Sequence, residues 1–310
     1  MKGRGFIGIA LVALAAFGGV VAFAASRPLP ALGRVGTSYT LLFSSVGWLV
    51  FAAPFAGLLV AGFTRRQDPR VEGDHVLRHD GAAMLAHWTH GLGTAALLVT
   101  GILLGFLFVP RVLGGFTGAG FLYNLHFVAV LFFLFGTFYW LANTLLATER
   151  FREHLPTDKA IPYTVQHYGL LLGMKQFKMP PEDKYFESER MAFILALVAT
   201  GLIVLSGFVK VAAHYYAVPS ILGRVANLTH DIATLLMLAF FAAHVFFAAI
   251  LPSSWPMLRS MLTGYLPLGH AQHEHAGWLA RLEAETAEPD NVVPLHDPSS
   301  VDAASRAESI

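Results

Sequence analysis

The sequence of 310 residues contains no cysteine. This absence excludes structural disulfides, thiolate-held iron–sulfur clusters, CxxCH haem attachment and cysteine zinc sites within the chain. Charged residues are also few, at 13% of the sequence, with 21 Lys and Arg against 20 Asp and Glu. The formal net charge of +1 lacks the basic excess that nucleic-acid binding requires, so no nucleic-acid partner is expected. The 14 histidines are therefore the main candidate metal ligands.

Apolar residues make up 55% of the chain, which is typical of a protein embedded in membrane lipid. A spanning helix needs about 20 mostly apolar residues. Six stretches come close to this length, and they predict an all-α membrane protein: residues 6–25, 38–63, 82–109, 121–147, 190–213 and 225–250. The first stretch has two interpretations, because its basic start, apolar run and small-residue end are equally typical of a cleavable signal peptide. Residues 1–25 are thus either a signal peptide or an N-terminal anchor helix.

The distribution of Lys and Arg predicts the orientation of these helices, since positively charged loops stay in the cytoplasm. Residues 64–80 hold four arginines, and residues 148–190 hold seven Lys and Arg. The connections 110–120 and 214–224 hold one Arg each, so we expect them on the outer side. The chain is then a multi-pass protein of the bacterial inner membrane, with a cytoplasmic loop at 148–189 and a cytoplasmic C-terminus.

Two polar regions have further predicted structure. Residues 162–179 are too short and too polar to span the membrane, but amphipathic enough for a helix at the cytoplasmic interface. Residues 266–310 form a predicted cytoplasmic tail, with a short surface helix at 271–285 and a disordered end from about 286.

Five histidines fall inside the predicted spans, where ionisable residues are rare and usually functional: His87, His90, His126, His230 and His244. The predicted orientation sorts them by depth. His87 and His90 lie near the inner side, His126 and His230 near the outer side, and His244 near the inner side.

His230 and His244 project from nearly the same face of one helix, because 14 residues complete almost four turns. They are separated by about 21 Å along its axis. His230 can therefore form an outer site together with His126. His244 can form an inner site together with His87. Ligation of two stacked b-type haems by two histidine pairs explains this placement. His90 is the alternative to His87, since it lies three residues away on the same face.

The remaining histidines that we consider lie outside the predicted spans. His75 and His79 occur in a charged loop, while His270, His273 and His275 form an HxxHxH cluster in the tail. We expect all five on solvated surface. A labile zinc or nickel site in the tail is the alternative.

At this point the sequence resembles the cytochrome b, or gamma, subunit of membrane-bound formate dehydrogenases and its relatives in thiosulfate reductases and nickel–iron hydrogenases. The resemblance covers about residues 78–285. It depends on Ala86-His87-Trp88, on Leu125-His126, on the pair His230 and His244, on Ser260–Gly264 and on Trp278–Glu283.

The resemblance implies a four-helix transmembrane haem-binding core at residues 78–265, with one or two additional N-terminal transmembrane helices, of which 38–63 is one. It implies an inner haem b on His87 and His244 and an outer haem b on His126 and His230. It also implies two partners, an iron–sulfur subunit and a catalytic molybdenum or tungsten subunit, and quinone (menaquinone or ubiquinone) as the substrate near the inner haem.

One segment departs from the family pattern. Gamma subunits usually have a KYNxxQK stretch near the quinone, whereas this chain has Lys184-Tyr185-Phe186-Glu187-Ser188-Glu189-Arg190. The Asn and Gln are missing. Tyr185, Ser188 and Glu189 are the candidate replacements for quinone contact, although capping of the helix by Ser188 is an equally good interpretation.

The sequence therefore predicts a non-catalytic subunit that passes electrons from a periplasmic formate dehydrogenase to quinone near the cytoplasmic side. The alternative within the same class is a quinol-oxidising subunit of a thiosulfate or polysulfide reductase or of a hydrogenase. An alternative of another class is a haem-free proton or metal transporter.

Overall fold

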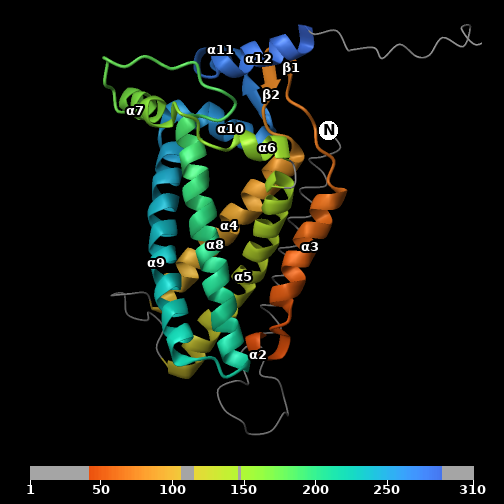
Figure 1. Cartoon of the computed structure of the whole chain (residues 1–310), viewed down its shortest axis with the longest axis vertical. Helices are drawn as coiled ribbons and strands as arrows, with labels where there is room; N and C mark the ends of the chain where they lie inside the picture. The colour runs from red at the N-terminus through yellow and green to blue at the C-terminus, as the bar shows by residue number, and fades with distance from the viewer. Residues whose placement is uncertain (1–41, 106–114, 146–147, 288–310) are drawn as a thin grey trace, which may run out of the picture.

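The computed structural model describes residues 42–105, 115–145 and 148–287 of the chain. Its framework consists of four long helices: α4 (Gly81–Leu104), α5 (Gly115–Leu145), α8 (Glu187–Tyr215) and α9 (Ser220–Val245). The π-helix η2 (Phe246–Ile250) extends α9. The helices alternate in direction and lie roughly parallel to the long axis of the molecule (Figure 1).

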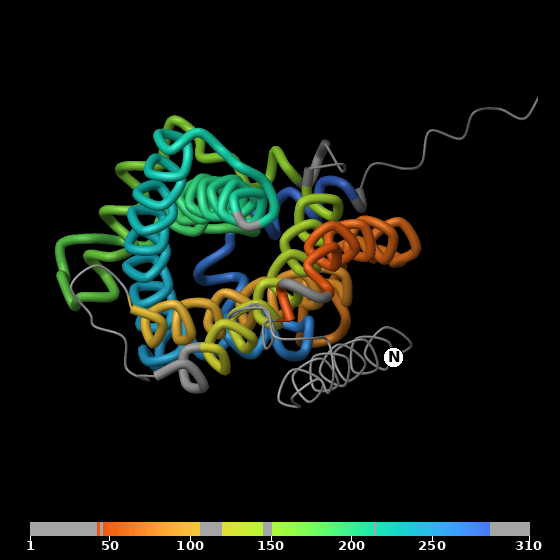
Figure 2. The backbone as a smooth tube through the Cα atoms, turned by 90° about the horizontal axis from the view of Figure 1, so that it is seen from below, coloured from red at the N-terminus to blue at the C-terminus, as the bar shows by residue number. Residues whose placement is uncertain are grey.

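The bundle is built from two helix pairs. α4 packs along α5, and α8 packs along α9, whereas contacts between the two pairs are few. Seen along the bundle, the four helices surround a common centre (Figure 2). Glycines allow the close approach of α4 and α5: a Cβ on Gly93 would lie 2.8 Å from Phe133 Cα, and one on Gly136 would lie 2.7 Å from the backbone of His90.

Three helical segments of the described part are long and apolar enough to cross a membrane: Gly120–Thr144, Glu187–Ala213 and Ser220–Ile250. They correspond to three of the predicted spans. α4 lies alongside them but is not one of the three, and it ends at Leu104 instead of residue 109, because Gly105 adopts a φ of 102°. The segment 6–25 lies outside the described residues.

The predicted helix at 38–63 is interrupted. It consists of α2 (Leu42–Val46) and α3 (Leu49–Phe63), with a turn at residues 47–48. α3 is a shorter apolar helix that packs on α5, where Ala61 joins Leu85 and Tyr139 in a buried cluster.

We call the end of the bundle that carries the non-spanning elements the capped end, and the opposite end the far end (Figure 1). The capped end holds these elements: β1 (Arg70–Glu72), β2 (His75–Leu77), α6 (Thr148–Glu153), α7 (Ala160–Leu171), η3 (Pro252–Ser254), α10 (Trp255–Thr263), β3 (Tyr265–Pro267), α11 (Leu268–Glu274) and α12 (Ala276–Ala287). The predicted helix at 162–179 corresponds to α7, which is shorter.

One expectation for this end was wrong, and another was incomplete. The protein is mostly helical but not all-α, since β1, β2 and β3 form an antiparallel sheet that pairs Val71 with Val76 and Val76 with Leu266. The predicted surface helix at 271–285 corresponds to α11 and α12, but the region is more buried than a surface helix. The two helices fold onto the sheet, and Trp278 is 1% exposed in a core with Val76 and Leu266. The predicted disorder beyond residue 287 lies outside the described residues.

Capping residues fix the starts of the helices that enter the bundle from this end. Asp80 accepts a hydrogen bond from the Ala83 amide at 2.8 Å and starts α4. At the start of α8, the Glu189 carboxylate accepts the Phe186 amide at 3.0 Å. Glu189, and not Ser188, is thus the residue that caps this helix.

Candidate functional site

α9 carries two of the predicted ligands without interruption between them. His230 lies toward the far end and His244 toward the capped end of one continuous helix. At 1.5 Å per residue, the two positions are separated by about 21 Å along the axis. α9 therefore places one imidazole at each of two levels of the bundle.

At the level near the capped end, α4 brings His87 opposite His244. Their ring centroids are 5.9 Å apart, with the ring planes at 54°. Two imidazoles that bind one metal through bonds of about 2 Å each, with about 1 Å from nitrogen to ring centre, have centroids about 6 Å apart. The inner pair thus has the spacing that would suit two histidines bound to one iron.

At the far level, α5 brings His126 near His230, close enough for their charges to interact. His126 Nδ1 lies 2.8 Å from the Thr100 hydroxyl, and His230 Nδ1 lies 3.0 Å from the Ser206 hydroxyl. Each hydroxyl donates its own proton to the backbone carbonyl four residues earlier, at 2.7 and 2.6 Å.

These hydroxyl oxygens must therefore accept from the imidazoles, which places the ring protons of His126 and His230 on Nδ1. The Nε2 lone pair of each ring is then available to a metal. A ligand histidine is usually oriented by such a hydrogen bond from its other nitrogen. A glycine follows each hydroxyl residue: a Cβ at Gly101 or Gly207 would lie 3.7 or 3.8 Å from the nearer ring.

His90 has different surroundings from those of His87. Its Nδ1 lies 3.0 Å from the Thr137 hydroxyl, its Nε2 lies 3.5 Å from the Thr200 hydroxyl, and its ring stacks on Trp140 at 5.3 Å. Both nitrogens of His90 thus have hydroxyl neighbours, whereas His87 faces His244. The geometry favours His87 as the partner of His244.

The inner pair borders a cavity of about 1040 Å³ that extends to the capped end. This volume is at the upper end of the range of small-molecule and cofactor sites. Its walls include the inner histidines and all three candidate quinone residues, Tyr185, Ser188 and Glu189. The residues present therefore fit a porphyrin held between α4 and α9, with an adjoining space that polar side chains border.

The three candidate quinone residues have different surroundings. Arg78 and Lys184 lie 5.5 and 5.3 Å from the centre of the Tyr185 ring. Ser188 interacts with the Tyr168 hydroxyl on α7. Glu189 accepts from Arg78 at 2.9 Å, and 38% of its side chain is exposed. Tyr185 is thus surrounded by cations, while Ser188 and Glu189 lie beside α7.

Two of the histidines that we expected on solvated surface are buried instead. His79 is 4% and His275 is 0% exposed. His79 contacts the Arg78 guanidinium at 2.8 Å, and His275 Nδ1 lies 2.6 Å from the Asp183 carbonyl. Burial holds the pKa of both imidazoles well below the ordinary value, and the positive charge of Arg78 lowers the pKa of each further.

The alternative of a metal site in the tail has no support in the described part of the chain, where no three His, Cys, Asp or Glu side chains form a metal-binding group. His273 has a side chain that is 74% exposed, and His270 pairs with Glu274 at 3.3 Å.

Two buried ionisable groups were missed by the sequence analysis. Glu182 is 1% exposed and one of its carboxylate oxygens has no hydrogen-bond partner, so burial raises its pKa to about 7. His167 is 8% exposed and borders the cavity from α7. No local pattern marks either residue, since both are buried by contacts with distant segments. Only the prediction of an interfacial helix around His167 pointed to its region.

The fold and the site define a multi-pass membrane protein whose bundle encloses two histidine pairs at two depths. A family model described as prokaryotic cytochrome b561 matches residues 78–264, which is more than half of the chain. The chain belongs to this family of four-helix membrane cytochromes, which bind haem b, typically two, and transfer electrons. It is therefore an electron-transfer subunit and not a catalytic one. No curated protein matches the sequence.

Proposed function

We propose that this chain anchors a formate dehydrogenase to the bacterial inner membrane and connects it to the quinone pool. In this proposal an iron–sulfur subunit, attached to a catalytic molybdenum or tungsten subunit, delivers electrons at the far end. Quinone is reduced at the capped end. The observation that carries the proposal is the pair of facing histidines His87 and His244 at the edge of a large cavity.

The four histidines have separate roles. His87 and His244 hold the inner haem, and His126 and His230 hold the outer haem. Bound haem b supplies one-electron transfer, and the chain sets the axial ligands, their orientation and the local polarity. The hydrogen bonds of Thr100 and Ser206 keep the outer ligands in the tautomer that binds iron.

The capped end faces the cytoplasm in this proposal, because it carries the loops rich in Lys and Arg. Each electron that crosses from the outer to the inner site moves toward the negative side of the membrane, against the membrane potential, at about 2.3 kcal/mol per 100 mV. The Ser188 and Glu189 side chains border the cavity on the α7 side and supply the polar contacts for the quinone headgroup. Tyr185 borders the same cavity on its cationic side.

The experiment is a reduced-minus-oxidised spectrum of the purified chain, combined with a count of haem per polypeptide. We expect two b-type haems. His230→Ala should remove the outer haem and leave the inner one, and His244→Ala should do the reverse. Loss of both haems from either variant, in a protein that remains folded, contradicts the pairing.

The second candidate function is that of a quinol-oxidising subunit of a hydrogenase or of a thiosulfate or polysulfide reductase. It is favoured by the match to a family of the nickel-hydrogenase cytochrome b type. Purification of the intact complex separates the two, because the metal and activity of the partner subunit differ. Membership in a haem-binding family leaves the haem-free transporter without support.

A further inference from the structure

α7 forms a wall of the inner cavity at the capped end. Thr164, His167, Tyr168 and Leu171 recur at helical spacing, and all four side chains border the cavity. α7 also carries exposed apolar side chains, with Ile161 at 70% and Val165 at 53%, and Leu172, which directly follows the helix, is 66% exposed. α7 is thus amphipathic, with one face toward the cavity and the other toward the membrane interface.

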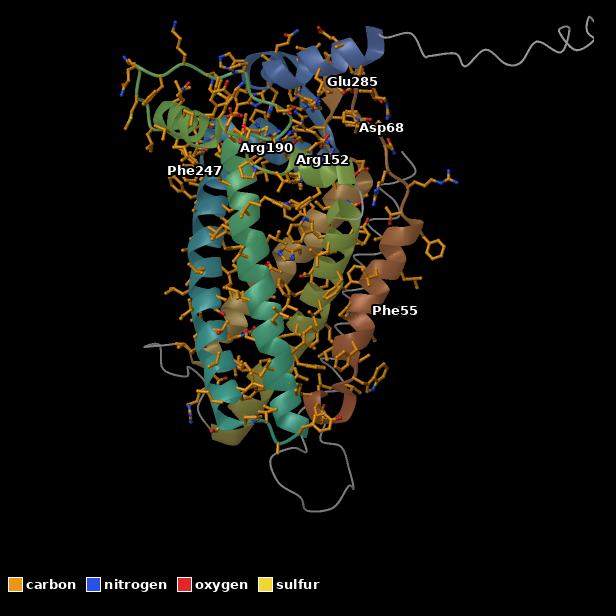
Figure 3. All side chains as sticks on the ribbon, in the orientation of Figure 1. Phe55, Asp68, Arg152, Arg190, Phe247 and Glu285 are labelled. Carbon is orange, nitrogen blue, oxygen red and sulfur yellow. The ribbon has the colours of Figure 1, made fainter. Side chains whose placement is uncertain are left out.

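The wall continues across to η2. The Tyr168 ring lies 4.6 Å from that of Phe247, which is labelled below α7 in Figure 3. A π-helical turn such as η2 is frequent at functional sites, and this one begins two residues after His244. The α7 side of the cavity therefore contacts the helical turn that follows His244 in the chain.

His167 is the unsatisfied polar group on this wall. It is 8% exposed, its ring meets the Phe186 ring edge-on at 4.3 Å, and its buried Nδ1 atom has no hydrogen-bond partner. A buried polar atom without a hydrogen-bond partner destabilises the protein, so a partner is expected when the site is in use. The cavity beside it is where such a partner can bind.

Carboxylates on two other elements act on this imidazole. Glu189 on α8 and Glu274 on α11 both favour its charged form, while burial is the larger effect and lowers its pKa below the ordinary value. The titratable groups that act on or contact His167 come from three elements and one connection: Tyr168 on α7, Glu189 on α8, Glu274 on α11 and His275 after α11. Arg78 pairs with Glu189 at 2.9 Å, and Arg78 and His270 act on His275.

We propose that His167 is the residue that exchanges a proton with quinone in the inner cavity. This inference rests on the proposed function and adds to it a residue that lies outside the KYNxxQK-like segment. The position of His167 satisfies three conditions for the role: it borders the cavity, it has a free ring nitrogen, and it lies near carboxylates that stabilise the imidazolium.

The proposed proton transfer is as follows in the direction of quinol oxidation. Oxidation of a quinol to a quinone releases two electrons and two protons; bound haem b would accept the electrons, and the protons must be taken up by other groups. One hydroxyl O–H bond breaks as its proton binds Nδ1 of neutral His167, and the proton of the other hydroxyl passes to water. The imidazolium then releases its proton to water at the capped end. In the direction of quinone reduction, the same transfers run in reverse.

The experiment uses the purified haem-loaded chain and follows the reduction of its haems by menadiol or decylubiquinol from pH 5 to 8.5. In the wild type the rate should rise with pH through an inflection below 6.5, because only neutral His167 accepts the proton. His167→Gln keeps a hydrogen-bonding side chain but does not titrate. We expect a rate about 100-fold lower, without this inflection, and an unchanged haem spectrum.

His154→Gln is the matched control, since His154 borders the same cavity on the side of Tyr185, at 4.3 Å between the rings. It should retain the wild-type rate within about threefold. A second variant, Glu274→Gln, removes a carboxylate that favours the charged imidazole. The inflection should then move to lower pH, which a purely structural role of His167 does not predict.

Two results overturn the inference, and they differ. If His167→Gln keeps the wild-type rate and inflection, His167 does not exchange the proton, while the proposed function stands. If quinol does not reduce the haems of the wild type, although dithionite does, the quinone-linked function itself fails. Should His167→Gln lose its haems, the Glu274→Gln inflection decides: an unmoved inflection overturns the assignment.

Discussion

Thr100 Oγ1 lies 2.8 Å from Nδ1 of His126, and it does so while donating its own proton to the Ala96 carbonyl. A hydroxyl on α4 thus fixes the tautomer of an imidazole on α5. Ser206 has the same relationship to His230, through the Leu202 carbonyl. Each outer histidine is therefore oriented by a hydroxyl group on the helix that packs along its own helix. This is α4 for His126 and α8 for His230.

Removal of these hydroxyls should weaken the outer site selectively. We expect the double variant Thr100→Val, Ser206→Ala to bind the outer haem with about 10- to 100-fold lower affinity, because such supporting hydrogen bonds orient metal ligands. The inner haem should remain. The measurement is haem retention by spectroscopy during dilution. Thr94→Val is the control on α4, since the Thr94 hydroxyl bonds the His90 carbonyl and not an imidazole. Equal loss of the two haems contradicts the prediction.

His90 and His87 should respond differently to substitution. His87→Ala removes the ring that faces His244, so we expect one haem per polypeptide in this variant. His90→Asn keeps a polar side chain between Thr137 and Thr200, so we expect two haems. The measurement is haem content per polypeptide. Retention of two haems in His87→Ala with loss of one in His90→Asn reverses the assignment.

Helix packing should depend on particular glycines. Gly93→Ala places a Cβ 2.8 Å from Phe133 Cα on α5, so the helices must move apart, and we expect a loss of about 1–3 kcal/mol of stability. Gly91→Ala, two residues away, meets nothing within 4 Å and is the matched control. Thermal unfolding of the protein in detergent measures both variants. Similar midpoints for the two contradict the proposed close contact.

Glu182 makes stability depend on pH in a direction that can be calculated. Burial raises its pKa from 4.5 to about 7, so the folded protein binds this proton more tightly than the unfolded chain does. The contribution of Glu182 is then most favourable below pH 4.5 and is lost as pH rises through about 7. The total change is roughly 3 kcal/mol, from 1.36 kcal/mol per unit of pKa.

Glu182→Gln removes this dependence, so the variant should gain stability relative to the wild type as pH rises from 4.5 to 7. Because His79 and His275 have lowered pKa values and act in the opposite direction, the informative quantity is the difference between the two proteins. Unfolding midpoints at matched pH give that difference. A constant difference across the range contradicts the raised pKa.

Much of the bundle could be predicted from the sequence, because a long apolar run is a local property. The positions of α5, α8 and α9 followed from such runs. The helical period placed His230 and His244 on one face, and α9 is continuous between them. The turn at residues 47–48 was missed because Val46, Gly47 and Trp48 continue the apolar run.

The capped end could not be predicted in the same way. β1, β2 and β3 have three residues each, which is too few for an alternating pattern. Val76 and Leu266 are paired in adjacent strands although they are far apart in the sequence. His275 is buried because the Asp183 carbonyl and the Phe186 ring lie beside it, and both come from a segment about 90 residues earlier. Burial of this kind depends on tertiary contacts that no local pattern records.

The continuity of α9 has a consequence for how the two redox sites can vary. Under the proposed ligation, the rise between them is set by the number of residues from His230 to His244, and not by side-chain packing. One inserted residue would turn one imidazole by 100° relative to the other, so that only one of them still faced its partner. Substitutions elsewhere can change the surroundings of each site separately, but the distance between the two sites stays constant as long as the number of residues between His230 and His244 does.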